Sequence, residues 1–265
     1  MLELQNVTKI FNAGTVDQKI ALDHLSLSLA EGDFVTVIGG NGAGKSTVLN
    51  AIAGVWKPDE GKILIDGQDM TAIPEFKRAK YLGRVFQDPQ LGTAGKMNID
   101  ENLALARRRG KYRGLRWGIS KKEREEYRAM LAELNLGLET RLSTKIGVLS
   151  GGQRQAVTLL MASLQRPKVL LLDEHTAALD PKTAAKVLEL TDKVVKENHL
   201  TALMVTHNMK DAITYGNRLI MMHSGKVILD ISGEEKKQLT VEALLKQFSI
   251  AAGESFANDR ALLTD

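Results

Sequence analysis

Ten consecutive residues, Ile38 to Thr47, read IGGNGAGKST and combine four glycines with one lysine and two hydroxyl side chains. Glycine adopts backbone conformations that other residues avoid, so successive N–H groups can turn inward around an anion. The segment matches the pattern G-x-x-x-x-G-K-[ST], in which Lys45 reaches the β- and γ-phosphates and the Ser46 hydroxyl binds Mg²⁺. We therefore expect a bound nucleoside triphosphate on Gly39, Gly40, Asn41, Gly42, Ala43, Gly44, Lys45, Ser46 and Thr47.

The elements that flank this loop support the same interpretation. Asp33 to Ile38 is a short apolar, β-branched run and predicts a buried strand. Ser46 to Ala53 predicts a helix that ends near Gly54. A glycine-rich turn without a ligand is the alternative, but a loop between a strand and a helix is the context that favours phosphate binding.

Two adjacent carboxylates follow a second apolar run. Val169 to Asp173 predicts a central parallel strand, which places Asp173 and Glu174 at the carboxyl edge of the sheet. Asp173 is suited to support Mg²⁺ through its water shell, and Glu174 to activate a water molecule. A strand followed by an acidic turn is the alternative; the phosphate loop earlier in the chain favours the catalytic interpretation.

A third motif, Leu149 to Gln155, reads LSGGQRQ and lies just before the carboxylate strand. The Ser150 hydroxyl, two glycines that expose N–H groups and a helix starting behind them could form a second phosphate clamp. The alternative is a helix N-cap with a glycine turn. The order of the three motifs along the chain argues against that alternative.

These motifs together resemble those of ATP-binding-cassette (ABC) ATPases, whose signature is LSGGQ, and the resemblance spans residues 2 to about 230. It implies that Ser150, Gly151, Gly152 and Gln153 contact nucleotide. Four further positions match family motifs, and their roles are implied by the resemblance alone. They are the Q-loop Gln87, which would bind the metal and assist catalysis, the D-loop Asp180, the switch His207, and Phe11, which would stack on adenine.

The resemblance also implies the fold, an α/β P-loop core of ABC type with an antiparallel β edge and an inserted all-helical subdomain. Strand patterns at 62–67, 168–173 and 201–206, and a hairpin at 218–230, agree with it. Between 89 and 165 the sequence is rich in charged residues and has a helical pattern, with helices expected at 98–106 and 121–134. We expect an ATP-binding core at 1–88 and 163–232, a helical subdomain with the signature motif at 89–162, and a helical tail at 233–265, with a helix at 241–248.

The chain departs from the family pattern DEPTSALD, because it has Asp173-Glu174-His175-Thr176-Ala177-Ala178-Leu179-Asp180. His175 replaces a proline and Ala177 a serine. The loss of the serine hydroxyl would weaken coupling across a dimer. We expect His175 to be a solvent-facing loop residue; the alternative is that it titrates beside Glu174.

Composition sets broad limits. The chain has 265 residues, 43% hydrophobic and 26% charged, as in ordinary globular proteins. It has no cysteine, which is compatible with a reducing cytoplasm. We expect no signal peptide and no membrane-spanning segment, since no stretch approaches about 20 apolar residues. A net charge of +4 is weak evidence for anionic partners.

The mechanism implied by the resemblance needs two copies of the chain, ATP and Mg²⁺. The loop at 39–46 of one copy holds ATP, and Ser150, Gly151 and Gly152 of the other copy cover its γ-phosphate. Glu174 polarises the attacking water, and His207 holds the γ-phosphate and Glu174 in register. Lys45 and Mg²⁺ neutralise the charge that develops on the phosphates. Hydrolysis removes the shared phosphate and opens the dimer.

The implied partners are an integral membrane permease, which holds the cassette at the cytoplasmic face of the cell membrane, and an extracytoplasmic solute-binding protein. Segments such as VFQDPQLGT and LDEHTAALDPKTAAKVLELT are similar to bacterial tryptophan/tyrosine-type importer ATPases. An amino acid or related small solute is therefore the expected cargo. Alternatives are a nucleic-acid- or ribosome-associated ABC ATPase and an envelope- or lipoprotein-directed one. We expect no nucleic acid, because the chain has one cassette and no sustained heptads.

The segment from Arg107 to Arg128 contains ten Lys or Arg and three Glu. Such a basic segment near the cytoplasmic leaflet would attract anionic headgroups. A solvated charged helix explains the same composition equally well.

Overall fold

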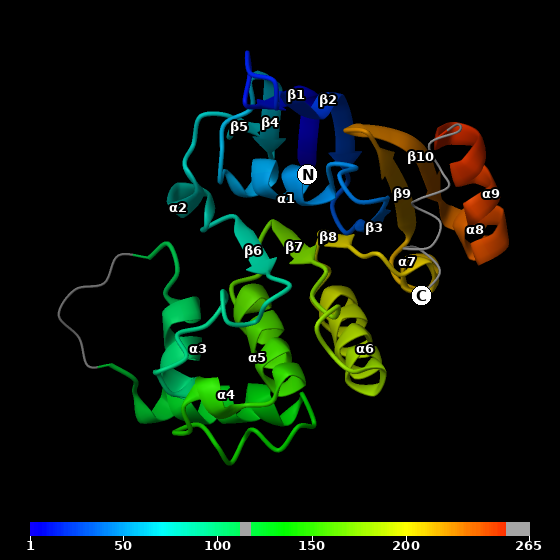
Figure 1. Cartoon of the computed structure of the whole chain (residues 1–265). Helices are drawn as coiled ribbons and strands as arrows, with labels where there is room; N and C mark the ends of the chain where they lie inside the picture. The colour runs from blue at the N-terminus through cyan, green and yellow to red at the C-terminus, as the bar shows by residue number, and fades with distance from the viewer. Residues whose placement is uncertain (112–117, 253–265) are drawn as a thin grey trace.

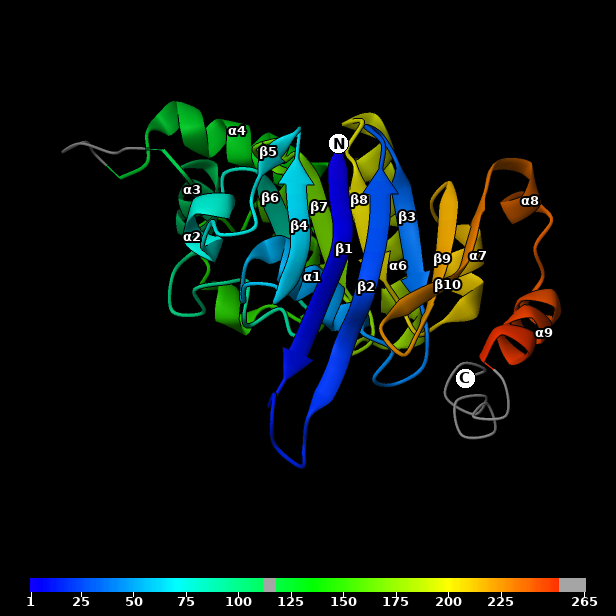
Figure 2. The same cartoon turned by 90° about the horizontal axis from the view of Figure 1, so that it is seen from above.

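Two β-sheets pack face to face in the computed structural model, which describes residues 1–111 and 118–252 (Figures 1 and 2). The first sheet is antiparallel, with strand order β2-β1-β4-β5. Its strands are β1 (Leu2–Phe11), β2 (Lys19–Leu29), β4 (Glu60–Ile65) and β5 (Gln68–Asp69). This sheet is the antiparallel edge that the family resemblance implied.

The second sheet has strand order β10-β9-β3-β8-β7-β6 and is parallel apart from β10, which pairs antiparallel with β9. Its strands are β3 (Phe34–Ile38), β6 (Leu82–Val85), β7 (Val169–Asp173), β8 (Ala202–Val205), β9 (Arg218–His223) and β10 (Lys226–Ser232). The strands and the hairpin predicted from apolar runs are confirmed within a few residues at their ends.

The parallel strands are apolar throughout because both of their faces are buried. Leu171 and Leu203 pack toward the antiparallel sheet, in one cluster with residues of α1. Leu170 and Leu172, one position along, pack on the opposite face in a cluster with residues of α5 and α6. This alternation fixes the register of β7, so Asp173 follows at the carboxyl end of the strand.

In the view of Figure 1, α1 lies between the two sheets, and the other helices lie beside and below them. They are α1 (Lys45–Ala53), α2 (Glu75–Arg78), α3 (Ile99–Arg107), α4 (Lys121–Ala132), α5 (Gly151–Ser163), α6 (Pro181–Glu197), α7 (Met209–Thr214), α8 (Gly233–Lys237) and α9 (Val241–Ala252), with a 3₁₀ turn at Ile146–Val148. α1 ends where Gly54 takes a left-handed conformation, as predicted.

Helices α3, α4 and α5 share a hydrophobic core of their own, which includes Ile99, Leu103, Tyr127, Leu131 and Val157. They form the inserted helical subdomain, seen below the sheets in Figure 1. α5 also contributes to the cluster under the parallel sheet, so it belongs to both cores. The division at 88/89, 162/163 and 232/233 stays a prediction.

Four of the eight basic side chains of the segment that the structure describes are paired with acids. Arg107 pairs with Glu126, Arg108 with Glu123, Arg124 with Asp100, and Arg128 with Glu125. Arg113 and Arg116 lie outside the described residues. These ion pairs compensate part of the positive charge of the segment.

The tail begins with α8 and α9. Leu244 and Phe248 of α9 are buried against Ile38, Met209 and neighbouring apolar side chains at the edge of the parallel sheet. The helix predicted at 241–248 is therefore confirmed, while residues 253–265 of the expected tail lie outside the described residues.

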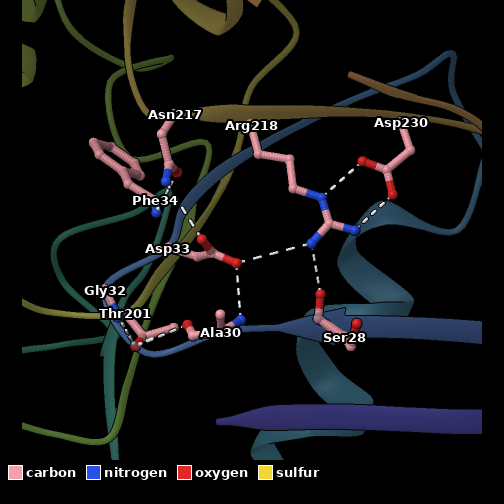
Figure 3. Close-up of polar contacts among 9 residues, drawn as sticks. All are labelled: Ser28, Ala30, Gly32, Asp33, Phe34, Thr201, Asn217, Arg218 and Asp230. Carbon is pink, nitrogen blue, oxygen red and sulfur yellow. Dashed lines mark hydrogen bonds and ion pairs between the residues drawn. The ribbon is translucent and has the colours of Figure 1, made fainter. Parts of the chain in front are cut away.

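A polar network joins the two sheets at Arg218 on β9 (Figure 3). Its guanidinium makes two parallel bonds to Asp230, at 2.7 and 2.6 Å, and donates to the Ser28 carbonyl of β2 at 2.7 Å. Asp33 lies 3.8 Å away, and the interaction with Asp230 raises the pKa of Arg218. Bidentate geometry makes this a stronger contact than an ordinary surface pair.

Arg218→Met is expected to lower the free energy of unfolding by about 2 kcal/mol, because it removes the charge-assisted hydrogen bonds of a guanidinium side chain that is only 19% exposed. Urea denaturation followed by circular dichroism measures the loss. Lys226→Met is the matched control on β10: its exposed pair with Asp23, at 2.9 Å, should contribute less than about 1 kcal/mol. Equal losses in the two variants would contradict the assignment.

Candidate active site

The glycine loop connects β3 to α1, and two of its glycines are required by close backbone contacts. Gly39 and Gly44 have φ of 153° and 101°. A Cβ on Gly39 would lie 2.3 Å from the Met222 carbonyl oxygen, and one on Gly44 would lie 2.7 Å from that of Ala21. Any side chain there would push the loop away from β9 and β2. The loop can thus lie against both sheets because Gly39 and Gly44 have no side chains.

A cavity of ≈ 230 Å³ lies over this loop and over the start of α1, where helix N-termini favour anions. Phe11 at the end of β1, Lys19 at the start of β2 and Glu174 line it together with residues 41–47. The structure thus brings the predicted phosphate loop, the predicted adenine contact and the predicted base to one cavity. The lining carries two lysines for one carboxylate, which suits an anionic ligand.

Lys45 is buried at the floor of this loop. Its Nζ donates to the carbonyl oxygens of Gly39, at 2.7 Å, and Gly40, at 3.1 Å. These contacts keep the ammonium folded over the loop, among the backbone groups expected to face phosphate. The position agrees with the role predicted for Lys45, which stays a prediction.

Phe11 is held by neighbours that the sequence did not point to. Its ring packs edge-on against Trp56, with centroids 5.9 Å apart, and Lys9 Nζ lies 5.5 Å from its centroid. Phe11 is 37% exposed, so part of the ring remains open for stacking on a base.

Glu174 and His207 meet because β7 and β8 are neighbouring parallel strands. The Glu174 N–H donates to Val205 O, and Glu174 has a φ of 43°, an uncommon conformation for a residue other than glycine. Glu174 Oε2 lies 3.8 Å from His207 Nδ1, an ion pair slightly longer than a hydrogen bond. The polar interaction with His207 lowers the pKa of Glu174, and the same interaction raises the pKa of His207. Glu174 is therefore ionised at neutral pH and available as a base.

Asp173 has a partner that the sequence analysis missed. Arg84 of β6 places Nη2 at 3.3 Å from Asp173 Oδ2. Burial raises the pKa of Asp173, and Arg84 opposes that shift. The sequence analysis expected no strand at 82–85, and neither spacing nor composition identifies Arg84 as the partner of Asp173.

Asp173 and Gln87 line a second cavity, of ≈ 430 Å³, together with Asn50, Arg84 and Phe86. Ser46 lines the first cavity, together with Glu174, so the three predicted metal residues are divided between two neighbouring cavities that share the Asp173–Glu174 pair in sequence. Hydroxyl, carboxylate and amide oxygens are ligands that Mg²⁺ accepts when phosphates and water complete its shell. Among residues 1–111 and 118–252, no group of three or more His, Cys, Asp or Glu is placed to hold a metal alone. Ser46, Asp173 and Gln87 therefore fit a metal ion that is also bound by the phosphates of a nucleotide.

The signature residues lie in another part of the chain. Ser150 caps α5 through the Gln153 N–H, and the Gln153 side chain returns to the Ser150 N–H, a capping box. Ser150, Gly152 and Gln153 line a separate cavity of ≈ 430 Å³, which α6 also borders. Asp180 caps α6 by accepting from the Thr183 N–H. Within one chain, the structure does not bring the signature residues or Asp180 to the glycine loop.

The expectation of a solvent-facing His175 was wrong, because the side chain is 2% exposed. Its Nε2 lies 3.0 Å from Thr191 Oγ1 on α6, and that hydroxyl donates to Val187 O at 2.8 Å. The hydroxyl proton is thus engaged, so Nε2 must carry the hydrogen between His175 and Thr191. The loop after Glu174 turns beneath α6, and burial lowers the pKa of His175 to about 4. His175 is therefore neutral at neutral pH, which argues against the alternative of titration beside Glu174. Ala177 is exposed.

A pH titration distinguishes the two histidines. The raised pKa of His207 means that its pairing stabilises the fold fully below pH 6.5 and is lost as the pH rises through the raised value. We expect the His207 ring signals in NMR to titrate with a midpoint above 6.5, and those of His175 with a midpoint at about pH 4. Glu174→Gln should return the His207 midpoint toward 6.5. A midpoint at or below 6.5 in the unaltered protein would argue against the pair.

Comparison with known proteins gives concordant results. A family model described as "ABC transporter" matches residues 22–177. A tyrosine transport ATP-binding protein of Clostridioides difficile is 47% identical over 251 residues, which are 95% of this chain and 100% of that protein. The spermidine/putrescine import ATP-binding protein PotA of Mesoplasma florum is 35% identical over 86% of this chain and 60% of its own length. The ATP-binding cassette MJ0796, solved as a dimer in a post-hydrolysis state with ADP and Pi, superposes with a TM-score of 0.73, at 32% identity, over 88% of this chain and 98% of that one.

Proposed function

The chain belongs to the ABC transporter family of ATP-hydrolysing cassettes, and from that premise we propose that two copies close around two ATP molecules to drive a separate permease. The observation that carries this proposal is the single cavity shared by the glycine loop, Phe11 and Glu174, with His207 paired to Glu174. It has a phosphate cradle and an ionised base at one place.

The separation of the signature from that cavity supports a second copy. Ser150 and Gly152 line a different hollow from Lys45 and Ser46, so one chain supplies a cradle without a lid. A head-to-tail partner would bring its own Ser150, Gly151 and Gly152 over the γ-phosphate. The similarity to the MJ0796 cassette, solved as a dimer, favours the same arrangement here.

Within such a site, each side chain has a defined task. Glu174 accepts a proton from the attacking water, and His207 holds Glu174 in position and contacts the γ-phosphate. Lys45 neutralises charge that develops on the phosphates. Ser46, Asp173 and Gln87 are the residues that would hold Mg²⁺, which supplies further neutralisation of the β- and γ-phosphates when bound.

The proposed transport direction is import, and the proposed cargo is an amino acid or related small solute. The relative from Clostridioides difficile is named for tyrosine transport, and PotA for import of spermidine and putrescine. The relative at 47% identity matches 95% of this chain and 100% of its own length, so we favour an aromatic amino acid over a polyamine.

The proposed partners are an integral membrane permease and an extracytoplasmic solute-binding protein, with the cassette at the cytoplasmic face of the cell membrane. In the described part of the chain, no helix is long and apolar enough to cross a membrane. The cavity beside Gln87 carries the apolar side chains Val55 and Leu91 at its rim, which are 48% and 71% exposed. Exposed apolar side chains around a hollow are typical of a docking surface.

Purification of the tagged chain from membranes, with its partners identified by mass spectrometry, tests this function. We expect a permease in stoichiometric amount, and ATP-dependent tyrosine uptake once the complex and its binding protein are reconstituted in vesicles. Co-purification of ribosomal or nucleic-acid-bound material instead, with salt-sensitive stimulation of ATP hydrolysis by RNA or DNA, would overturn the proposal.

A further inference from the structure

Arg84 is a cation inside an otherwise apolar strand. β6 (Leu82–Val85) forms the edge of the parallel sheet beside β7, and its other side chains pack inward. The Arg84 side chain is only 14% exposed, so its charge needs compensation from nearby groups. Its partners therefore indicate why a cation is placed there.

The contacts of Arg84 join three elements of the site. Nη2 donates to Asn50 Oδ1 on α1 at 2.7 Å and to Asp173 Oδ2 on β7 at 3.3 Å. The guanidinium carbon lies 4.6 Å from the centre of the Phe86 ring, in the segment that leads to Gln87. One side chain thus connects the helix behind the glycine loop, the carboxylate expected to support the metal, and the Q-loop.

We propose that Arg84 is a positioning residue that restrains the metal site, because its guanidinium competes with the divalent cation for the carboxylate of Asp173. The inference rests on the proposed function, in which Asp173 supports the metal that accompanies ATP. The inference also goes beyond the proposed function, because Arg84 belongs to none of the sequence motifs assigned above.

The direction of the effect follows from charge. A guanidinium within hydrogen-bond distance of Asp173 repels a divalent cation at the same carboxylate and occupies one of its oxygens. Removing that charge leaves a half-buried carboxylate that a metal can neutralise without competition. The metal should therefore bind more tightly when Arg84 is absent.

The contact between Arg84 and Phe86 also connects the metal site to the Q-loop. Phe86 packs on the guanidinium, and Phe86, Gln87, Arg84 and Asp173 all line the cavity proposed to meet the permease. A partner that shifts Phe86 would also shift Arg84 relative to Asp173. The occupancy of the metal site is then linked to docking through one side chain.

The test is a direct measurement of metal affinity. Mn²⁺ binding to the protein with saturating ADP is followed by electron paramagnetic resonance in unaltered protein, Arg84→Met, Arg84→Gln and Arg84→Lys. We expect Arg84→Met and Arg84→Gln to bind Mn²⁺ about tenfold more tightly, the size expected when the metal no longer competes with a charge-assisted hydrogen bond at the carboxylate. Arg84→Lys keeps the charge and should stay near the unaltered protein.

A double-mutant cycle shows whether Arg84 acts through Asp173. In an Asp173→Asn background, adding Arg84→Met should change Mn²⁺ affinity much less, because the competition for the carboxylate is gone and only the direct charge repulsion remains. Arg84→Gln retains a polar group for Asn50 and keeps the test valid if the methionine variant does not fold. Mn²⁺ affinity that is unchanged or weaker in both neutral variants, or an effect of the same size without Asp173, would overturn the inference.

Binding of ADP in EDTA separates this result from the proposed function. We expect ADP affinity without metal to be the same in all Arg84 variants, since Arg84 does not line the cavity over the glycine loop. Failure of the unaltered protein to bind ADP would count against nucleotide binding itself. Failure of the variants alone to bind ADP would count against a role for Arg84 confined to the metal.

Discussion

Glu174→Gln is expected to reduce ATP turnover by about a hundredfold or more while leaving ATP binding intact. The amide keeps the shape of the side chain but cannot accept the proton of the attacking water. Lys45 and the loop from Gly39 to Ser46 are unchanged, so the phosphates retain their contacts. The variant should accumulate as an ATP-bound dimer, because hydrolysis is the step proposed to open it. Phosphate release and size-exclusion chromatography with ATP measure the two effects.

A matched control separates a lost base from a general loss of acidic charge. Glu235→Gln removes a carboxylate from α8, outside the cavities that border the glycine loop and the Q-loop, and should leave turnover unchanged. Wild-type turnover in Glu174→Gln would exclude Glu174 as the base. A monomeric Glu174→Gln protein in ATP would count against the dimer, even if hydrolysis is lost.

Residues defined by local pattern were predictable from the sequence. The apolar runs that become β3, β7 and β8 are buried on both faces, and that burial is what makes them apolar. The glycine loop needs its unusual φ values at Gly39 and Gly44, and glycine is the residue that provides them. The capping box of Ser150 and Gln153 is likewise a local feature, legible in four consecutive residues.

Residues defined by distant partners were not predictable in this way. His175 is buried because α6 packs over it, and its partner Thr191 is 16 residues away. Arg84 and Asp173 are 89 residues apart and meet only because β6 and β7 are adjacent in the sheet. The spacing of residues in the sequence predicts neither the His175–Thr191 contact nor the Arg84–Asp173 contact, since helix packing and strand order are properties of the folded chain. The ion pairs of the basic segment were not predictable for the same reason, because Arg107 and Arg124 each pair with an acid on the neighbouring helix of the α3–α4 pair.

Gly151→Asp is expected to abolish ATP-dependent dimerisation and to lower turnover by about a hundredfold or more, while the monomer binds ATP normally. Gly151 is the exposed first residue of α5, and its new Cβ would have Leu179 Cδ2 at 3.1 Å, a flexible neighbour. A carboxylate at a helix N-terminus suits the helix dipole, so α5 should fold. It would, however, place negative charge where the partner's γ-phosphate is proposed to bind. Equilibrium binding of a fluorescent ATP analogue measures nucleotide affinity, and sedimentation in the Glu174→Gln background measures dimerisation. Phosphate release by the single Gly151→Asp variant measures turnover.

Mixing two inactive variants decides whether the site is shared between chains. Lys45→Ala disables the cradle, and Gly151→Asp disables the lid. In a heterodimer of the two, both defects fall in one site, and the other site combines an intact cradle with an intact signature. Turnover should therefore reappear on mixing, although each variant alone is inactive. If turnover stays absent in heterodimers isolated with two different tags, the cradle and the lid do not come from different subunits, and the signature must act within its own chain. The structure argues against that outcome, because Ser150 and Lys45 line separate cavities within one copy.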